Sequence, residues 1–206
     1  MNILVISSNL IGDTILSTGI IKYFLDKYPN SKFTFVVGPS ASQLYENFPN
    51  LERIIAIKKQ KFNFHWFSIW EKCFFKKWDT IIDFRSSLVS YILLHHKKYI
   101  FKASNDKHQL KQLSKFFQID QIPYPVIYNN TKEIEIVNKI LFFNKKYIVI
   151  APGGNWIPKI WLSDRFNQLL KLLIEKYSNL NFILVGSFAE KKKYFKNVVK
   201  NIDNKN

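Results

Sequence analysis

The chain has 206 residues, of which 47% are hydrophobic, so its length allows one large domain or one domain with part of a second. Its formal charge is +16, yet all but three of the 31 basic residues are lysine. No RNP motif, zinc finger or arginine-rich arm occurs in the sequence, so we do not expect nucleic acid as a partner.

The cysteine content and the N-terminus indicate the compartment. Cys73 is the single cysteine and cannot form an intrachain disulfide, which agrees with a reducing environment. The N-terminus has no basic leader, its apolar run is broken at Ser7, and no stretch of about 18 apolar residues follows. We therefore expect neither a signal peptide nor a transmembrane segment, and a cytoplasmic location.

Residues 2–28 predict a strand, a tight turn and a helix. Ile3–Ile6 is an apolar run typical of a strand buried on both faces of a parallel sheet. Gly12 is expected to supply a backbone angle that other residues avoid. Asp13 stands where the helix begins, and the turn alone leaves two interpretations open: a helix cap, which is the commoner use, or a base at the carboxyl end of a strand.

The next segment adds a second strand, 32–37, which completes a βαβ unit, then a short helix at 41–48 and a third strand at 53–57. Residues 58–78 combine lysine with tryptophan and phenylalanine at helical spacing. Such a helix either lies in a membrane interface or covers the sheet, and the sequence leaves both open.

A further strand, 80–84, and a helix, 86–94, are predicted next. Asp83 and Arg85 lie at the carboxyl end of that strand, where they either orient a ligand hydroxyl or simply pair with each other. Neighbouring His95 and His96 would point about 100° apart on a helix, and no other cluster has ligand spacing, so we predict no metal site.

The second half begins after a helix at 107–117, an irregular connector at 121–126 and a helix at 132–143, which is expected to end the first domain. A second βα unit follows. Its predicted parts are a strand at 147–151, a loop at 152–162, a helix at 164–177 capped by Ser163, a strand at 181–185 and a lysine-rich helix.

Gly153, Gly154 and Lys159 in that loop suit a phosphate cradle, because glycines let a ligand approach the backbone and the lysine adds positive charge. An ordinary glycine-containing turn with a solvated lysine explains the same residues, and spacing alone does not separate the two.

Taken together, four segments resemble glycosyltransferase family 9, the ADP-heptose:lipopolysaccharide heptosyltransferases. They are residues 3–28 with Ile11-Gly12-Asp13 and Thr18, residues 78–90 (WDTIIDFRSSLVS), residues 148–166 (IVIAPGGNWIPKIWLSDRF), and residues 182–190, where a strand ends in Val-Gly and a glutamate follows.

The resemblance implies an α/β protein of GT-B type, with two Rossmann-like domains: an acceptor-side domain at 1–145 and a partial donor-side domain at 146–206. It implies Asp13 as the general base on the acceptor hydroxyl. Acceptor binding is assigned to Asn9, Gly12, Asp83 and Arg85, and donor phosphate binding to Gly153, Gly154, Asn155 and Lys159. The implied partners are a nucleotide-sugar donor and a lipid-linked oligosaccharide acceptor, with peripheral contact to the anionic inner face of the cytoplasmic membrane. Neither a cofactor nor a metal is expected.

The chain departs from the family pattern at two positions and in length. The family commonly has a basic residue where this chain has Ser7, and proline where it has Gly19. It also continues through an Asp-Thr-Gly turn and further βα units. Two strands and two helices in 146–206 predict an incomplete second domain, so the alternative function is a catalytically inactive module that binds glycolipid or anionic membrane.

Overall fold

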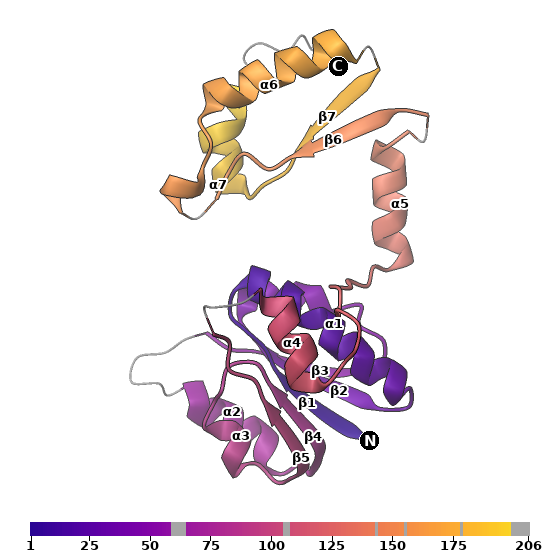
Figure 1. The fold of residues 1–206 in the computed structure, drawn as a ribbon, viewed down its shortest axis with the longest axis vertical. Coiled ribbons are helices and arrows are strands. Elements are labelled where there is room, and N and C mark those ends of the chain that lie inside the picture. The colour runs from indigo at the N-terminus through magenta and orange to yellow at the C-terminus, as the bar shows by residue number, and fades with distance from the viewer. Residues whose placement is uncertain (59–64, 105–107, 143, 155, 178, 199–206) are drawn as a thin grey trace. The chain divides into compact units, whose positions relative to one another are not determined.

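The structure is a computed structural model. The residues that it describes are 1–58, 65–104, 108–142, 144–154, 156–177 and 179–198. The chain separates into two compact units, Met1–Thr131 and Lys132–Asn206 (Figure 1). The helix predicted to end the first domain is thereby grouped with the second unit. No described helix is long and apolar enough to cross a membrane.

The first unit is a five-stranded sheet with helices on both faces. Its elements are β1 (Asn2–Ile6), α1 (Ile11–Lys27), β2 (Lys32–Val37), a 3-10 helix (Pro39–Tyr45), β3 (Leu51–Ala56), α2 (His65–Phe74), β4 (Trp78–Asp83), α3 (Val89–Ile92), β5 (His95–Ile100) and α4 (Gln109–Phe117). The strands run in the order β3-β2-β1-β4-β5. All four pairings are parallel, as a chain of βα units requires. The predicted Rossmann-like domain is confirmed.

Two apolar layers hold the helices to this sheet. On one face, α1 and α4 lie side by side, and Ile20, Phe24 and Leu113 of these helices are buried against Phe33 and Phe35 of the sheet. On the other face, α2 and α3 are buried through the residues Ile69, Cys73 and Val89. Alternate residues of β1 serve the two layers, which is why its sequence is apolar throughout.

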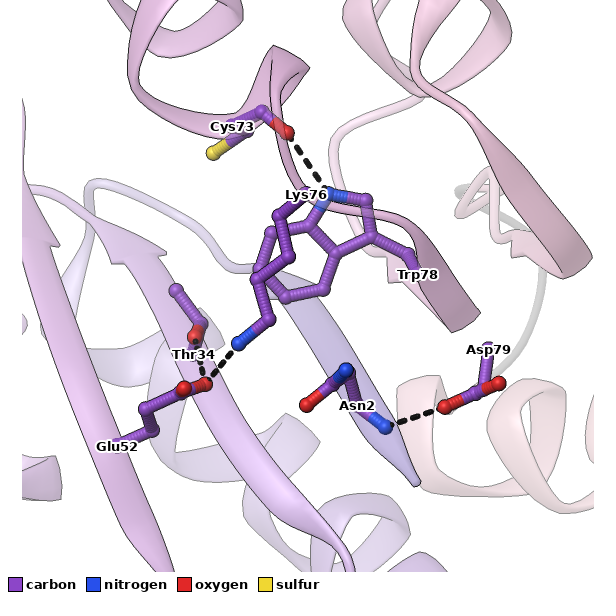
Figure 2. Close-up of polar contacts among 7 residues, drawn as sticks. All are labelled: Asn2, Thr34, Glu52, Cys73, Lys76, Trp78 and Asp79. Carbon is purple, nitrogen blue, oxygen red and sulfur yellow. Dashed lines mark hydrogen bonds and ion pairs between the residues drawn. The ribbon is translucent and has the colours of Figure 1, made fainter.

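The amino edge of the sheet is fastened by polar contacts (Figure 2). The Glu52 carboxylate accepts bonds from the Lys76 ammonium and, at 3.2 Å, from the Thr34 hydroxyl. The indole N–H of Trp78 donates to the Cys73 carbonyl at 3.1 Å, which ties the end of α2 to the start of β4. The polar side chains at the amino ends of the strands therefore hold the fold together. The loops in which the sequence predicted functional residues lie at the opposite, carboxyl ends of the strands.

The second unit contains a two-stranded parallel sheet. Its elements are α5 (Thr131–Ile140), β6 (Lys146–Ile150), a 3-10 helix (Ile157–Lys159), α6 (Ser163–Lys176), β7 (Leu180–Leu184), α7 (Phe188–Glu190), a π-helical turn (Lys191–Phe195) and α8 (Lys196–Val198). Ile150, Leu170 and Val198 are its buried hydrophobic residues among those described. The predicted small second parallel sheet is therefore confirmed, and its core is small.

Two predictions of local structure are wrong, each because tertiary context prevails. Only Val89–Ile92 of the helix predicted at 86–94 is helical, as α3. His95 and His96 begin the strand β5. The sequence did not indicate this strand, because it is rich in exposed lysines and histidines, which suit the edge of a sheet. Trp78 does not continue the preceding helix but opens β4, with 2% of its surface exposed. Part of the predicted 58–78 helix, residues 59–64, lies outside the described residues.

Candidate functional site

The loops singled out in the first unit meet at one point of the sheet. The chain leaves β1 toward β2 on one side and returns from β3 to β4 on the other, so the strand order reverses between β1 and β4. Ile6 and Asp83, the last residues of these strands, pair in register. Ligands of open α/β sheets bind outside the carboxyl ends of the strands at such a reversal. The β1–α1 and β4–α3 loops therefore form the candidate site.

Asp13 lies in the first turn of α1 and is partly exposed. The helix is preceded by Leu10 as its capping residue, without a side-chain cap bond, so the interpretation of Asp13 as a cap is wrong. Ser8 organises the loop instead: its hydroxyl accepts from the Leu10 N–H at 3.1 Å and lies 3.3 Å from the Asp13 Oδ2. A carboxylate with one hydroxyl donor retains lone pairs for a ligand.

Gly12 differs from its prediction. It is helical, and no described glycine has a positive φ, so an unusual backbone angle is not the reason for glycine here. A Cβ on Gly12 would have no neighbour within 4 Å. The glycine that shapes this loop is Gly38, whose Cβ would lie 2.8 Å from the Asn9 Cα. Gly12 leaves the backbone of the first turn of α1 open to solvent.

Ser7 and Gly19, the two departures from the family pattern, both have local explanations. Ser7 is fully buried, and its hydroxyl accepts from the Tyr45 phenol at 3.3 Å and lies 3.4 Å from the Thr14 hydroxyl. Burial raises the pKa of Tyr45 to about 12. A Cβ on Gly19 would lie 2.1 Å from the Pro123 carbonyl oxygen, so the 121–126 connector packs directly on α1 at this position.

The side chains of Asp83 and Arg85 do not form the simple pair that was one of the two interpretations of the sequence. The Asp83 carboxylate is fully buried and accepts from the Arg85 N–H at 2.7 Å, the Ser87 N–H at 2.7 Å and the Ser87 hydroxyl at 2.5 Å. No ion pair between the two side chains occurs among the described residues. Asp83 therefore fixes the β4–α3 turn, and its buried carboxylate is committed to that turn.

Arg85 reaches from the β4–α3 loop to the β1–α1 loop. Its Nη1 donates to the Asn9 Oδ1 at 3.3 Å, and its guanidinium carbon lies 4.8 Å from the ring centroid of Trp66 in α2. Burial lowers the pKa of Arg85, and the nearby Asp83 carboxylate opposes that shift. Sequence reasoning missed Trp66 as part of this site, because its spacing indicated only a helix face. Asn9 and Arg85 form one bridge across the reversal point.

The predicted phosphate cradle of the second unit contains a carboxylate. A Cβ on Gly153 would lie 2.5 Å from the Glu190 Oε1, and one on Gly186 would lie 3.2 Å from its Oε2. Glu190 is held by Ser187, whose backbone N–H donates to it at 2.7 Å in a capping box. These hydrogen bonds from Ser187 lower the pKa of Glu190. Contact with Glu190 thus explains why residue 153 is glycine.

The other side of this loop remains open. Gly154 and Lys159 are exposed, and the Lys159 ammonium lies 5.1 Å from the Trp156 ring centroid. Asn155 lies outside the described residues. Ser163 is the first residue of α6 and not its cap, because Leu162 precedes the helix and no side chain caps it. The uncapped N-terminus of α6 is available to an anion.

No protein-family model matches this sequence, and no curated protein matches it significantly. Solved structures do match. The heptosyltransferase WaaC of E. coli, solved with ADP, is 16% identical with a TM-score of 0.71, and the match covers 98% of this chain and 72% of that one. A glycosyl transferase of family 9 from Veillonella parvula has the same identity and TM-score, with 98% and 67% covered.

The E. coli ADP-heptose LPS heptosyltransferase II is also 16% identical, with a TM-score of 0.69 and coverage of 99% of this chain and 70% of that one. A sequence identity of 16% establishes a similarity of fold alone, and this similarity extends over nearly all of the chain. The chain therefore has the α/β fold of the GT-B heptosyltransferases, with a five-stranded Rossmann-like sheet and a small second parallel sheet.

Proposed function

We propose that this protein is a glycosyltransferase that moves heptose or a related sugar from a nucleotide-sugar donor resembling ADP-heptose to a lipopolysaccharide or other glycolipid acceptor. The observation that carries the proposal is the hydrogen bond between Asn9 and Arg85. It joins the β4–α3 loop to the β1–α1 loop, which leads into Asp13, at the reversal point of a sheet whose fold is that of heptosyltransferases. Solved structures of that fold contain ADP and an ADP-heptose analogue.

Asp13 is the proposed general base. A sugar hydroxyl is a poor nucleophile, and a carboxylate within hydrogen-bond reach accepts its proton as the oxygen bonds to the anomeric carbon of the donor. The partly exposed carboxylate, its single described donor Ser8 and its position at the positive end of α1 all suit an anionic group that meets a ligand.

Arg85 and Asn9 are the proposed acceptor-binding side chains, and Gly12 gives the acceptor access to the backbone. A guanidinium has five N–H donors, of which the described hydrogen bonds use one for Asn9. The remaining donors suit hydroxyl, carboxylate or phosphate groups of a glycolipid. In this proposal Asp83 holds the turn that aims Arg85 and does not itself contact the acceptor.

The leaving group is a nucleoside diphosphate, which takes the electron pair of the broken bond to the anomeric carbon. Lys159, the exposed Gly154 backbone and the N-terminus of α6 are the proposed groups that stabilise its charge. Gly153 cannot contact the diphosphate on the side where Glu190 lies, because the negative charges of the diphosphate and the Glu190 carboxylate would face each other there.

The test is a transfer assay with ADP-heptose and a heptose-deficient lipopolysaccharide. We expect ADP release and a heptosylated product in equal amounts, with ADP release depending on the acceptor. Donor binding by calorimetry without any product, across acceptors with and without phosphate, would contradict transferase activity.

The alternative, a module that binds anionic membrane without catalysis, has one specific observation in its favour. The outer surface of α2 and the residue after it expose Phe67 and Phe75, 64% and 93% respectively, beside the exposed lysines Lys72 and Lys77. Exposed aromatic rings among cations are typical of an interfacial anchor. Vesicle binding in the absence of turnover would favour this alternative over the enzyme.

A further inference from the structure

A polar cavity of about 450 Å³ lies in the first unit between the end of α1, the end of α4 and β5. It is remote from the candidate site, because Lys27, in its lining, and Asp13 are 14 positions apart on the same helix, or about 21 Å at 1.5 Å per residue. Its volume lies in the range of about 300–1,000 Å³ that is usual for small-molecule sites.

The lining of this cavity is cationic. Its lining residues include the lysines Lys27 and Lys97 and the tyrosines Tyr23 and Tyr99, and no aspartate or glutamate is among those described. The ion pairs of the described residues are Lys22–Asp26 and Lys76–Glu52, so neither lysine of the cavity is neutralised within the described chain.

The two lysines are held beside aromatic groups instead of carboxylates. The Lys27 ammonium lies 3.5 Å from the Tyr23 hydroxyl, and the Lys97 ammonium lies 5.1 Å from the Tyr99 ring centroid. Both lysine side chains are exposed, and a hydrogen bond with Tyr99 raises the pKa of Lys97.

Lys27 by itself has an ordinary explanation, since a cation in the last turn of a helix interacts favourably with the helix dipole. Lys97 has an ordinary explanation as well, since exposed lysines suit the edge strand β5. Neither explanation accounts for two lysines that line one cavity together with two tyrosines and with no carboxylate among the described lining residues. The floor of the cavity is rigid, because Phe24, Tyr99 and Phe117 pack with ring centroids 5.3–5.8 Å apart.

We propose that this cavity binds the phosphate group of a small phosphorylated molecule or of a phospholipid headgroup. Two ammonium groups and two hydroxyl donors match the oxygens of a phosphate, and Gln118 adds an amide for a neighbouring hydroxyl. The inference does not depend on the proposed sugar transfer.

Calorimetry with inorganic pyrophosphate at about 0.1 M salt tests the soluble form of the ligand. We expect the double variant Lys27→Gln/Lys97→Gln to weaken binding at least about tenfold, since charged hydrogen bonds are lost. The matched control Lys111→Gln/Lys171→Gln removes the same charge from two positions that are likewise exposed but lie outside the cavity, and it should change the affinity less than about twofold. Tyr23→Phe/Tyr99→Phe keeps the rings and should also weaken binding.

Co-sedimentation with phosphatidylglycerol vesicles, and with phosphatidylcholine vesicles as reference, tests the headgroup. Loss of binding to the anionic vesicles in the Lys27/Lys97 variant but not in the control assigns the site to a lipid. Equal losses in both double variants, in both assays, would overturn the proposal, because net charge alone would explain them. Pyrophosphate binding abolished by Lys159→Gln and untouched by Lys27→Gln/Lys97→Gln, with no vesicle effect, would overturn it as well.

Discussion

Two glycines of α1 differ in what surrounds them, and this difference is measurable. Gly19→Ala places a Cβ against the Pro123 backbone and should destabilise the protein by about 1–3 kcal/mol, despite the better helix propensity of alanine. Gly12→Ala meets nothing within 4 Å and should leave stability unchanged or raise it by up to about 1 kcal/mol. Urea unfolding of both variants checks this, and equal effects would contradict the packing of the connector on α1.

Substitution of Asp83 should mainly lower stability, whereas substitution of Arg85 should mainly lower activity. Asp83→Asn turns an amide toward the N–H groups that the carboxylate accepts, and should cost about 2–3 kcal/mol of unfolding free energy. Arg85→Gln removes a partly exposed guanidinium, so it should cost no more than about 1 kcal/mol while lowering kcat/KM about tenfold or more. The opposite assignment, with Arg85 affecting stability most, would remove it from the acceptor site.

The raised pKa values of Tyr45 and Cys73 predict that the protein loses stability at alkaline pH. Burial raises the pKa of Tyr45 to about 12 and that of the Cys73 thiol to about 11. Ordinary values are about 10 and 8.5, so above those values the unfolded chain has released protons that the folded chain still holds. Stability is therefore complete below about pH 8.5 and falls as pH rises through about 11–12.

Urea midpoints measured from pH 8 to pH 12 check this slope. Tyr45→Phe should flatten the part above about pH 10, on the order of 2 kcal/mol, whereas Tyr91→Phe, at an exposed ring, should not. An unchanged slope in Tyr45→Phe would show that the phenol titrates equally in both states.

At the scale of single residues, the sequence placed Asp13 after the first strand and Arg85 after the fourth, because these places depend on local strand-to-loop patterns. Their roles in a site stay predictions. The role of Asp83 could not be predicted, because it arises from the conformation of residues 84–87. The contact of Glu190 with Gly153 joins segments 37 positions apart, and nothing local in either sequence indicates it. Glycine within a helix, as at position 19, is a general sign of close approach, yet it does not reveal the partner.

Helix α2 shows how the element scale resolves an interpretation that the sequence left open. Ile69 and Cys73 are fully buried, and Trp66, Trp70 and Phe74 pack partly buried against the same layer, so this face covers the sheet. Periodicity predicted the helix but not its direction, because aromatic residues occur on both of its sides. The surface left for a membrane is the opposite one.

The vesicle test for α2 therefore uses the exposed rings. Phe67→Ala/Phe75→Ala should weaken co-sedimentation with anionic vesicles about tenfold, because two rings no longer enter the interface. Trp66→Ala/Trp70→Ala should lower stability instead, since both indoles pack on the core. Binding that ignores the two phenylalanines but falls with salt would assign the interaction to charge alone.

On the scale of the whole molecule, the two units differ in their cores. The first has two extensive apolar layers, whereas three described hydrophobic residues are buried in the second. Hydrogen exchange should accordingly be at least about tenfold faster for amides of β6 and β7 than for those of β1 and β4. Equal protection would contradict the inference that the second unit is the less stable one.

The predicted parallel sheet followed from the alternation of apolar strands and helices, whereas its strand order became known only from the structure. The edge strand β5 and the length of α3 could not be predicted, since exposed lysines and histidines have no period that distinguishes a strand. Because β1 and β4 are neighbours in the sheet, the loops that contain Asn9 and Arg85 meet although the two residues are 76 positions apart in the sequence.

The central claim is that the Asp13 carboxylate takes the proton of the acceptor hydroxyl, and steady-state kinetics of Asp13→Asn with calorimetry of ADP-heptose tests it most directly. Asparagine keeps the size of the side chain, so we expect donor affinity within about twofold of wild type and kcat lowered about 100- to 10,000-fold. Turnover by Asp13→Asn within about threefold of wild type, with the acceptor saturating, would contradict the account.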